Sequence, residues 1–274
     1  MGAGLKVLFL LFFLLSLGLT PQTWAQSARL QLSLVTAPPA MEVSAQQGWD
    51  QTSERSISTA AGPLRLQGLY DPQFLYIRLS FADSQADQTP GYLQWDEAFQ
   101  SYRSHLLPID RVALISWFPQ ADKQQKGDLW IWSALAGHGA EDATVTCSRY
   151  PFAQAEARLN DHGGLFYQKI TPDPGTAPYR LNVPKGKQTP KLPRTVAQTA
   201  TGSRADILTY SQWLDGQWTI LFKIPRQRTD PNDLPLQGVI PLTLLIHWAP
   251  TQPLCEQPVH LELELPPPTV KGAL

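Results

Sequence analysis

Apolar and polar residues alternate along several stretches of this chain, with the period of two that a half-buried β-strand produces. The alternation recurs at residues 218–224, 242–248 and 259–265. The clearest stretch sets Leu75, Ile77, Leu79 and Phe81 against Tyr76, Arg78 and Ser80. Beyond residue 25, no stretch holds a helical period of sustained length. The sequence therefore predicts an all-β protein with little helix.

Two other stretches, residues 112–118 and 129–132, are continuously apolar, which is typical of strands buried on both faces. We expect them at the centre of the main sheet. Between strands, residues 70–73 and 229–233 carry the Asp, Asn and Pro residues of turns. The predicted fold is an antiparallel β-sandwich of immunoglobulin-like or jelly-roll type, with long loops.

The first twenty-five residues have the pattern of a secretory signal peptide. Lys6 precedes an apolar run from Val7 to Leu19, and Thr23-Trp24-Ala25 offers a cleavage site. The run is shorter than the about 20 residues of a membrane span, so we expect an exported protein without a span in the mature chain. An uncleaved membrane anchor is the alternative. The rest reads as one sandwich domain over residues 26–268 with a tail at 269–274.

One segment, residues 171–204, lacks the strand alternation. It is rich in proline and lysine and has no periodicity. We interpret it as a long insertion. It is either a disordered or loosely packed surface loop, or an arm that docks a partner.

The net charge and the absence of catalytic motifs argue against several classes of function. The formal net charge is −1, without the clustered basic face of a nucleic-acid-binding protein. Carboxylates at Asp83, Asp96, Glu97 and Asp110 have no spacing that singles out an acid and base pair. Neither a Gly-x-Ser-x-Gly elbow nor a His-Glu-x-x-His helix is present. We expect a protein without a catalytic site of its own.

An ordered series of short motifs spans residues 48–265. They are Gly48-Trp49-Asp50, the Tyr70-Asp71 turn with its strand, Phe81-Ala82-Asp83, Trp95-Asp96, Asp110-Arg111, Asp128-Leu129-Trp130-Ile131-Trp132, Phe222-Lys223-Ile224-Pro225, Gly238-Val239-Ile240-Pro241 and His247-Trp248. In this order they resemble the haem-binding domain of ethylbenzene dehydrogenase and dimethyl sulfide dehydrogenase gamma subunits, which is related to DOMON and family 9 carbohydrate-binding sandwiches. The Asp110-Arg111 step also reads as an ion pair at a strand start.

The resemblance implies haem b as cofactor and one-electron transfer in the periplasm or a thylakoid-lumen-like compartment. Its partners would be molybdenum and iron–sulfur oxidoreductase subunits or small redox proteins. Six aromatic residues could line the haem slot, although such residues also fill sandwich cores. They are Trp117, Trp130, Trp132, Phe166, Tyr167 and Trp248.

The family's haem ligands are a methionine before the Trp-x-Trp strand and a lysine near the last strand. Here the loop Pro119–Gly127 has no methionine, and Cys255 stands near the lysine position. A cysteine thiolate can ligate haem iron. Cys255 could instead form a disulfide with Cys147, which an oxidising compartment permits, or be a small buried hydrophobe.

Histidine is the commonest haem ligand, and two of the five histidines draw notice. His138 lies between Gly137 and Gly139, and His247 alternates with Leu244, Ile246 and Trp248, so it faces away from that apolar set. The candidate iron ligands are therefore His138 and Cys255, with His247, Trp130 and Trp132 as further cofactor contacts.

The alternative function is a binding module without haem that recognises carbohydrate or another exported ligand. Tyr92, Trp95 and Tyr102 could stack on sugar rings, or they could simply pack onto the sandwich.

Overall fold

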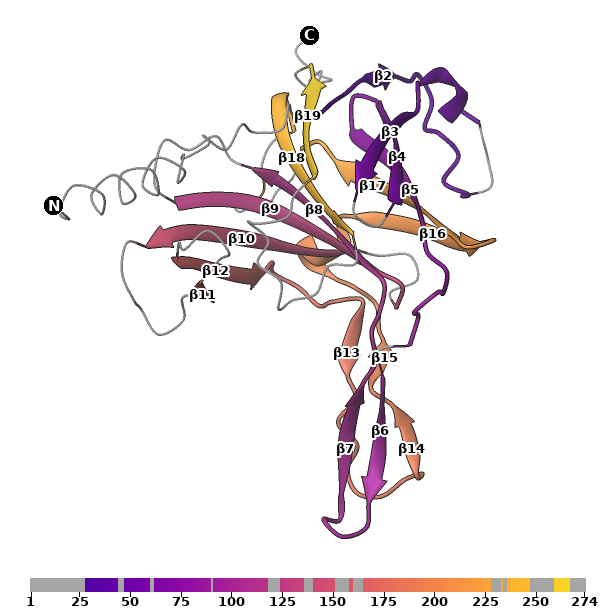
Figure 1. The fold of residues 1–274 in the computed structure, drawn as a ribbon, viewed down its shortest axis with the longest axis vertical. Helices are drawn as coiled ribbons and strands as arrows, with labels where there is room; N and C mark the ends of the chain where they lie inside the picture. The colour runs from indigo at the N-terminus through magenta and orange to yellow at the C-terminus, as the bar shows by residue number, and fades with distance from the viewer. Residues whose placement is uncertain are drawn as a thin grey trace, which may run out of the picture.

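The computed structural model describes residues 28–43, 47–59, 62–89, 91–117, 124–135, 140–150, 158–159, 165–227, 233, 236–246 and 259–266. Two sheets packed face to face form its body (Figure 1). The first has eight strands, in the order β1-β19-β18-β8-β9-β10-β12-β11. Their bounds are β1 Ala28–Leu30, β8 Arg111–Trp117, β9 Gln124–Ser133, β10 Glu141–Tyr150, β11 Arg158–Leu159, β12 Leu165–Pro172, β18 Gly238–Ile246 and β19 Val259–Leu265.

The second sheet has six strands, in the order β16-β17-β5-β4-β2, with β3 paired to β4. They are β2 Leu32–Leu34, β3 Arg55–Thr59, β4 Gly62–Tyr70, β5 Phe74–Ala82, β16 Leu208–Leu214 and β17 Gln217–Pro225. Pairing is antiparallel except at β1 with β19 and β2 with β4, which are parallel. Two short 3₁₀ turns, η1 Trp49–Gln51 and η2 Gly202–Ala205, complete the body. The predicted all-β sandwich is confirmed.

The main core fills the space between the sheets and follows the predicted alternation. Leu75, Ile77, Leu79 and Phe81 of β5 all belong to it. The apolar positions of β17, β18 and β19 face the same space. The strands β8 and β9 lie inside the larger sheet and are apolar on both faces, as their continuous apolar runs predict.

Each sheet also carries an apolar cluster on its outer face. On the six-stranded sheet it contains Trp49, Tyr76 and Leu221, with Met41 packed against it. On the eight-stranded sheet it contains Ile115, Leu129, Ile131, Val145 and Leu245. The described strands place no second sheet over this latter face, although its side chains are buried. We call it the outer apolar face.

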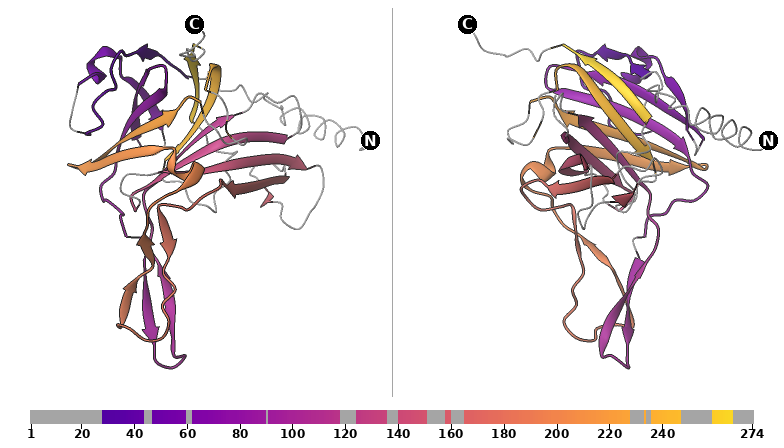
Figure 2. Two further views of the ribbon diagram at one scale, coloured as in Figure 1. Left: turned by 180° about the vertical axis from the view of Figure 1, so that it is seen from behind. Right: turned by 60° about the vertical axis from the view of Figure 1, so that its left-hand side comes forward.

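A narrow arm projects from the sandwich in every view (Figure 2). Its outer part pairs β14 (Lys191–Pro193) with β6 (Gly91–Asp96), which also pairs with β7 (Ser101–Leu106). Nearer the body, β13 (Tyr179–Leu181) pairs with β15 (Thr195–Ala197). The expectation of a loose loop at 171–204 is wrong, because this segment forms strands whose backbone groups bond to each other and to residues 91–96.

No helix in the described part of the chain is long and apolar enough to cross a membrane.

Candidate functional site

The aromatic residues predicted to line a haem slot occupy different places. Trp130 and Trp132 have no exposed surface and belong to the core between the sheets. Trp132 meets Trp218 edge to face, with ring centroids 4.9 Å apart. Trp117 instead lies on the outer apolar face. Trp248 and the side chains of Phe166 and Tyr167 lie outside the described part.

Asp110 at the start of β8 accepts hydrogen bonds that anchor the core. Its Oδ2 accepts hydrogen bonds from the Trp218 indole at 2.9 Å and from the backbone N–H of Asp87 at 2.8 Å. A buried carboxylate needs such donors, and they fix the orientation of the indole.

The candidate iron ligands His138 and Cys255 and the candidate cofactor contact His247 lie outside the described residues, in the gaps 136–139 and 247–258. The strand ends that border these gaps lie at one end of the eight-stranded sheet. Ser133 of β9 pairs with Arg111, and the next residue of β8, Val112, pairs with Ile246 of β18. The gap 118–123, which holds most of the loop where the family has methionine, borders the opposite end of β8 and β9. The roles of these three residues stay predictions, as does a Cys147–Cys255 disulfide.

A histidine that sequence reasoning passed over, His260, lies on the outer side of the eight-stranded sheet. It alternates with Val259 and Leu261, which face the core, and pairs with Thr243 of β18. Its Nδ1 lies 3.3 Å from Thr243 Oγ1, which also accepts the Trp117 indole N–H at 2.8 Å. Trp117 covers Gly127, where an added Cβ would come within 2.9 Å of the indole. Trp117, Thr243 and His260 therefore form one connected group beside the outer apolar face.

The chemistry of this group suits a metal-binding imidazole. Burial lowers the pKa of His260, which favours the neutral ring that can donate a nitrogen lone pair. The threonine oxygen has two lone pairs, so it can accept both the indole N–H and an Nδ1–H. That tautomer directs Nε2 away from Thr243, which is the arrangement that orients ligating histidines. Sequence reasoning could not find this group, because only the register shows that Thr243 and Trp117 are neighbours of His260.

This burial predicts a pH dependence of stability. An unfolded histidine has a pKa of about 6.5, whereas that of His260 is lower in the folded protein. Between the two values the unfolded chain binds more protons, so stability should fall as pH drops through about 6.5. Urea unfolding from pH 7.5 to 5.5, on the wild type and His260→Gln, should give a smaller loss in the variant. Equal losses would contradict the assignment.

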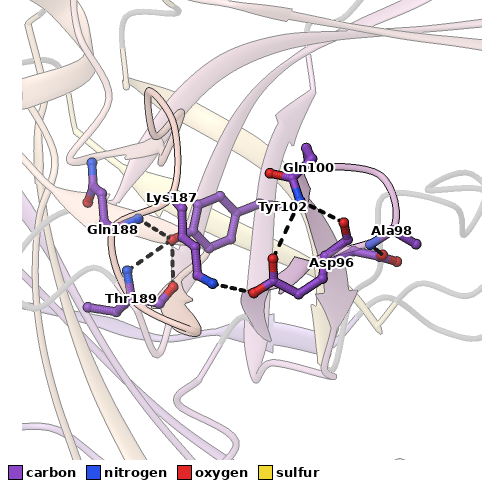
Figure 3. A network of polar contacts seen from close by, with 8 residues as sticks. Asp96, Ala98, Gln100, Tyr102, Lys187, Gln188 and Thr189 are labelled. Carbon is purple, nitrogen blue, oxygen red and sulfur yellow. Dashed lines mark hydrogen bonds and ion pairs between the residues drawn. The ribbon is translucent and has the colours of Figure 1, made fainter.

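The arm is held by a network centred on the Tyr102 hydroxyl (Figure 3). This hydroxyl donates to the Thr189 carbonyl at 2.6 Å and accepts the N–H groups of Gln188 and Thr189 at 3.0 and 3.1 Å. Nearby, Lys187 bonds to Glu97. Residues about ninety positions apart are thus fastened into one unit.

The proposed sugar platforms have partners within this arm. Trp95 meets Tyr102 edge to face at 5.1 Å, and Tyr92 stacks on His105 at 4.8 Å. Lys191 lies 3.6 Å from the centre of the Tyr92 ring. These rings therefore pack the arm together.

Replacing Tyr102 by phenylalanine should loosen the arm without unfolding the sandwich. The change removes three hydrogen bonds, each worth about 1 kcal/mol. Hydrogen exchange of peptides covering residues 185–192 should speed up, while those from β5 and β17 stay unchanged. Ser101→Ala, on the same strand, is the control. Unchanged exchange in the 185–192 peptides would refute this role of Tyr102.

Comparison with protein families matches residues 22–244 to the family described as Ethylbenzene dehydrogenase. A search of curated proteins finds no match. Among solved structures, a family 9 carbohydrate-binding module from Caldicellulosiruptor kristjanssonii, in complex with glucose, is similar. It shares 8% identity, the alignment covers 88% of this chain and 100% of that one, and the TM-score is 0.38. A likeness this low does not extend to ligands. Because the family match covers far more than half of the chain, this protein belongs to the ethylbenzene dehydrogenase family.

Proposed function

We propose that this protein is a haem b-binding electron-transfer subunit of an exported oxidoreductase system, without a catalytic site of its own. The family match over residues 22–244 carries the proposal. The outer apolar face, with the group formed by Trp117, Thr243 and His260 beside it, is the haem site that we propose.

The space between the sheets fits a haem poorly. Trp130 and Trp132 fill it as fully buried core residues. Met41, the one methionine beyond the signal segment, packs on the outer face of the six-stranded sheet. The outer apolar face instead combines buried aliphatic side chains with an imidazole donor, His260, at its border.

The roles of the residues follow from this placement. Haem b, when bound, supplies an iron that gains and loses one electron. His260 would hold the iron, oriented by Thr243, and the apolar side chains of Ile115, Leu129 and Val145 would exclude water and so help to set the potential. The second ligand would come from the candidates His138 and Cys255.

An electron-transfer protein needs a partner, and the arm offers a surface for an oxidoreductase subunit with an acidic face. The arm stands clear of the body (Figure 1). It carries six basic side chains against two acidic ones, Asp96 and Glu97. The basic residues are Arg103, Arg180, Lys185, Lys187, Lys191 and Arg194. A complex made through this surface should weaken as salt concentration rises, and an affinity insensitive to salt would contradict the assignment.

The test of haem binding is the absorption spectrum of the mature protein produced with ample haem. We expect a Soret band and, after reduction with dithionite, α and β bands. A colourless protein that does not take up added haemin would refute the proposal.

A further inference from the structure

Four aspartates that are far apart in the sequence meet at one point. One carboxylate oxygen from each of Asp128, Asp142, Asp173 and Asp233 lies within 4.8 Å of the other three. The first three side chains are buried, with exposed fractions of 2%, 0% and 4%, and Asp233 is partly exposed. Four carboxylates held this close together repel one another, which favours a cation among them.

The fold explains how they converge on the inner side of the eight-stranded sheet. In β9, Leu129 points outward and Trp130 inward, so Asp128 points inward as well. Asp142 of β10 pairs with Trp130, which places it diagonally beside Asp128 on the same face.

The other two aspartates come from chain connections. Asp173 follows β12, and its backbone N–H donates to the carbonyl of Asp142 at 3.2 Å. Asp233 comes from the connection between β17 and β18.

A buried serine beside the cluster gives a second, independent observation. Ser116 of β8 lies directly opposite Asp128 and projects from the same face. It has no exposed surface, and its Oγ has no hydrogen-bond partner among the described residues. A hydroxyl buried in this way is costly unless something binds it. A buried oxygen without a hydrogen-bond partner among the described residues thus lies opposite Asp128 of the cluster.

We propose that these residues bind a calcium ion. Calcium takes 6–8 oxygen ligands at about 2.3–2.6 Å, so oxygens on opposite sides of the ion lie about 4.8 Å apart. The four carboxylate oxygens fit within that span. Magnesium requires near-ideal octahedral geometry at about 2.0–2.1 Å, whereas calcium accepts an irregular set of carboxylate ligands such as this one. Ser116 and water would complete the coordination.

The ion would fasten the arm to the sandwich. Asp173 lies where the chain leaves β12 for the arm, and η2, on the returning side, bonds back to Pro174 through the Arg204 N–H. Calcium held by Asp173 and by Asp128 and Asp142 would fix this root against β9 and β10.

Two cations compete for the same carboxylates. Lys126 lies two residues before Asp128 on the same face, and η2, which contains Arg204, contacts β10. Ammonium and guanidinium groups could neutralise the cluster in place of a metal. The experiment must therefore distinguish a bound calcium ion from neutralisation by these two side chains.

The test is calorimetric titration of Ca²⁺ into the mature full chain after chelation of divalent metals. We expect one site with a Kd below about 1 mM, the range of extracellular modules. A tenfold excess of Mg²⁺ should not displace it. Tb³⁺ should bind competitively and luminesce through Trp130, which is paired with Asp142.

The variants Asp142→Asn and Asp233→Asn should each weaken Ca²⁺ binding at least ~10-fold. Asp233→Asn changes a connection outside the strands, so it stays informative if Asp142→Asn fails to fold. Asp215→Asn, in the turn between β16 and β17, is the control and should bind as the wild type does. A wild type without stoichiometric Ca²⁺ binding would assign the neutralising role to the cations and overturn the proposal. So would unchanged binding in Asp233→Asn, or displacement by Mg²⁺.

Discussion

Replacing Asp71 by alanine is expected to lower the free energy of unfolding by about 3–5 kcal/mol. Its Oδ1 accepts the N–H groups of Gln73 and Phe74, both at 2.7 Å, and its Oδ2 accepts the Tyr76 hydroxyl at 2.7 Å. Tyr76 has no exposed surface. Burial, the hydrogen bond to Asp71 and the negative charge of Asp71 together raise the pKa of Tyr76 well above its usual value. The alanine variant leaves three donors without an acceptor.

Urea unfolding followed by tryptophan fluorescence measures this loss. Tyr76→Phe should cost only about 1–2 kcal/mol, because it removes one hydrogen bond and leaves the two backbone bonds of the turn. Asp50→Ala, at an exposed aspartate in η1, should change stability by no more than about 0.5 kcal/mol. A loss of under about 1 kcal/mol in Asp71→Ala would show that the turn does not depend on this carboxylate.

The second large effect concerns Trp132. Its side chain is fully buried against Trp218, whose indole is held by Asp110. Trp132→Ala should therefore cost about 3–5 kcal/mol through the cavity that it leaves. Thermal unfolding with and without added haemin measures this cost and shows whether the cofactor changes it.

The result separates two roles for this tryptophan. Replacing a core residue lowers stability whether or not haemin is present. Replacing a residue that lines a cofactor slot lowers haem affinity and leaves the stability of the apoprotein unchanged. Phe99→Ala, at an arm-tip side chain that is 67% exposed, is the control and should change stability by no more than about 0.5 kcal/mol. An apoprotein of wild-type stability would contradict the core role of Trp132.

Sequence reasoning found the strands because burial imposes a period on them. The alternation at residues 75–81 and 259–265, and the continuous runs that became β8 and β9, each report how many faces of a strand are covered. The arm left no such signal. Its strands are short and bury little apolar surface, and its proline- and lysine-rich composition is typical of a loose loop.

The candidate sites depended on register, which a single sequence does not reveal. Asp128 and Asp142 are neighbours only because Asp142 pairs with Trp130. His260 meets Thr243 and Trp117 only because β8, β18 and β19 are adjacent. A one-residue shift would turn each side chain to the opposite face. The family resemblance suggested haem as the cofactor, and the structure suggested the outer apolar face as the place to test for it.

The haem and calcium proposals concern opposite faces of the eight-stranded sheet. The outer apolar face would hold haem, while the inner face would hold a calcium ion at the root of the arm. Because His260 and Asp142 lie on opposite faces of the sheet, replacing one should leave the other ligand bound.

The most direct test of haem binding at the outer apolar face is the dithionite-reduced minus oxidised spectrum of the haemin-loaded wild type and His260→Ala, with His105→Ala as control. We expect α and Soret bands in the wild type and control, and their loss or a clear shift in His260→Ala. Haem bands in all three proteins at the same positions and intensities, or in none, would contradict the account.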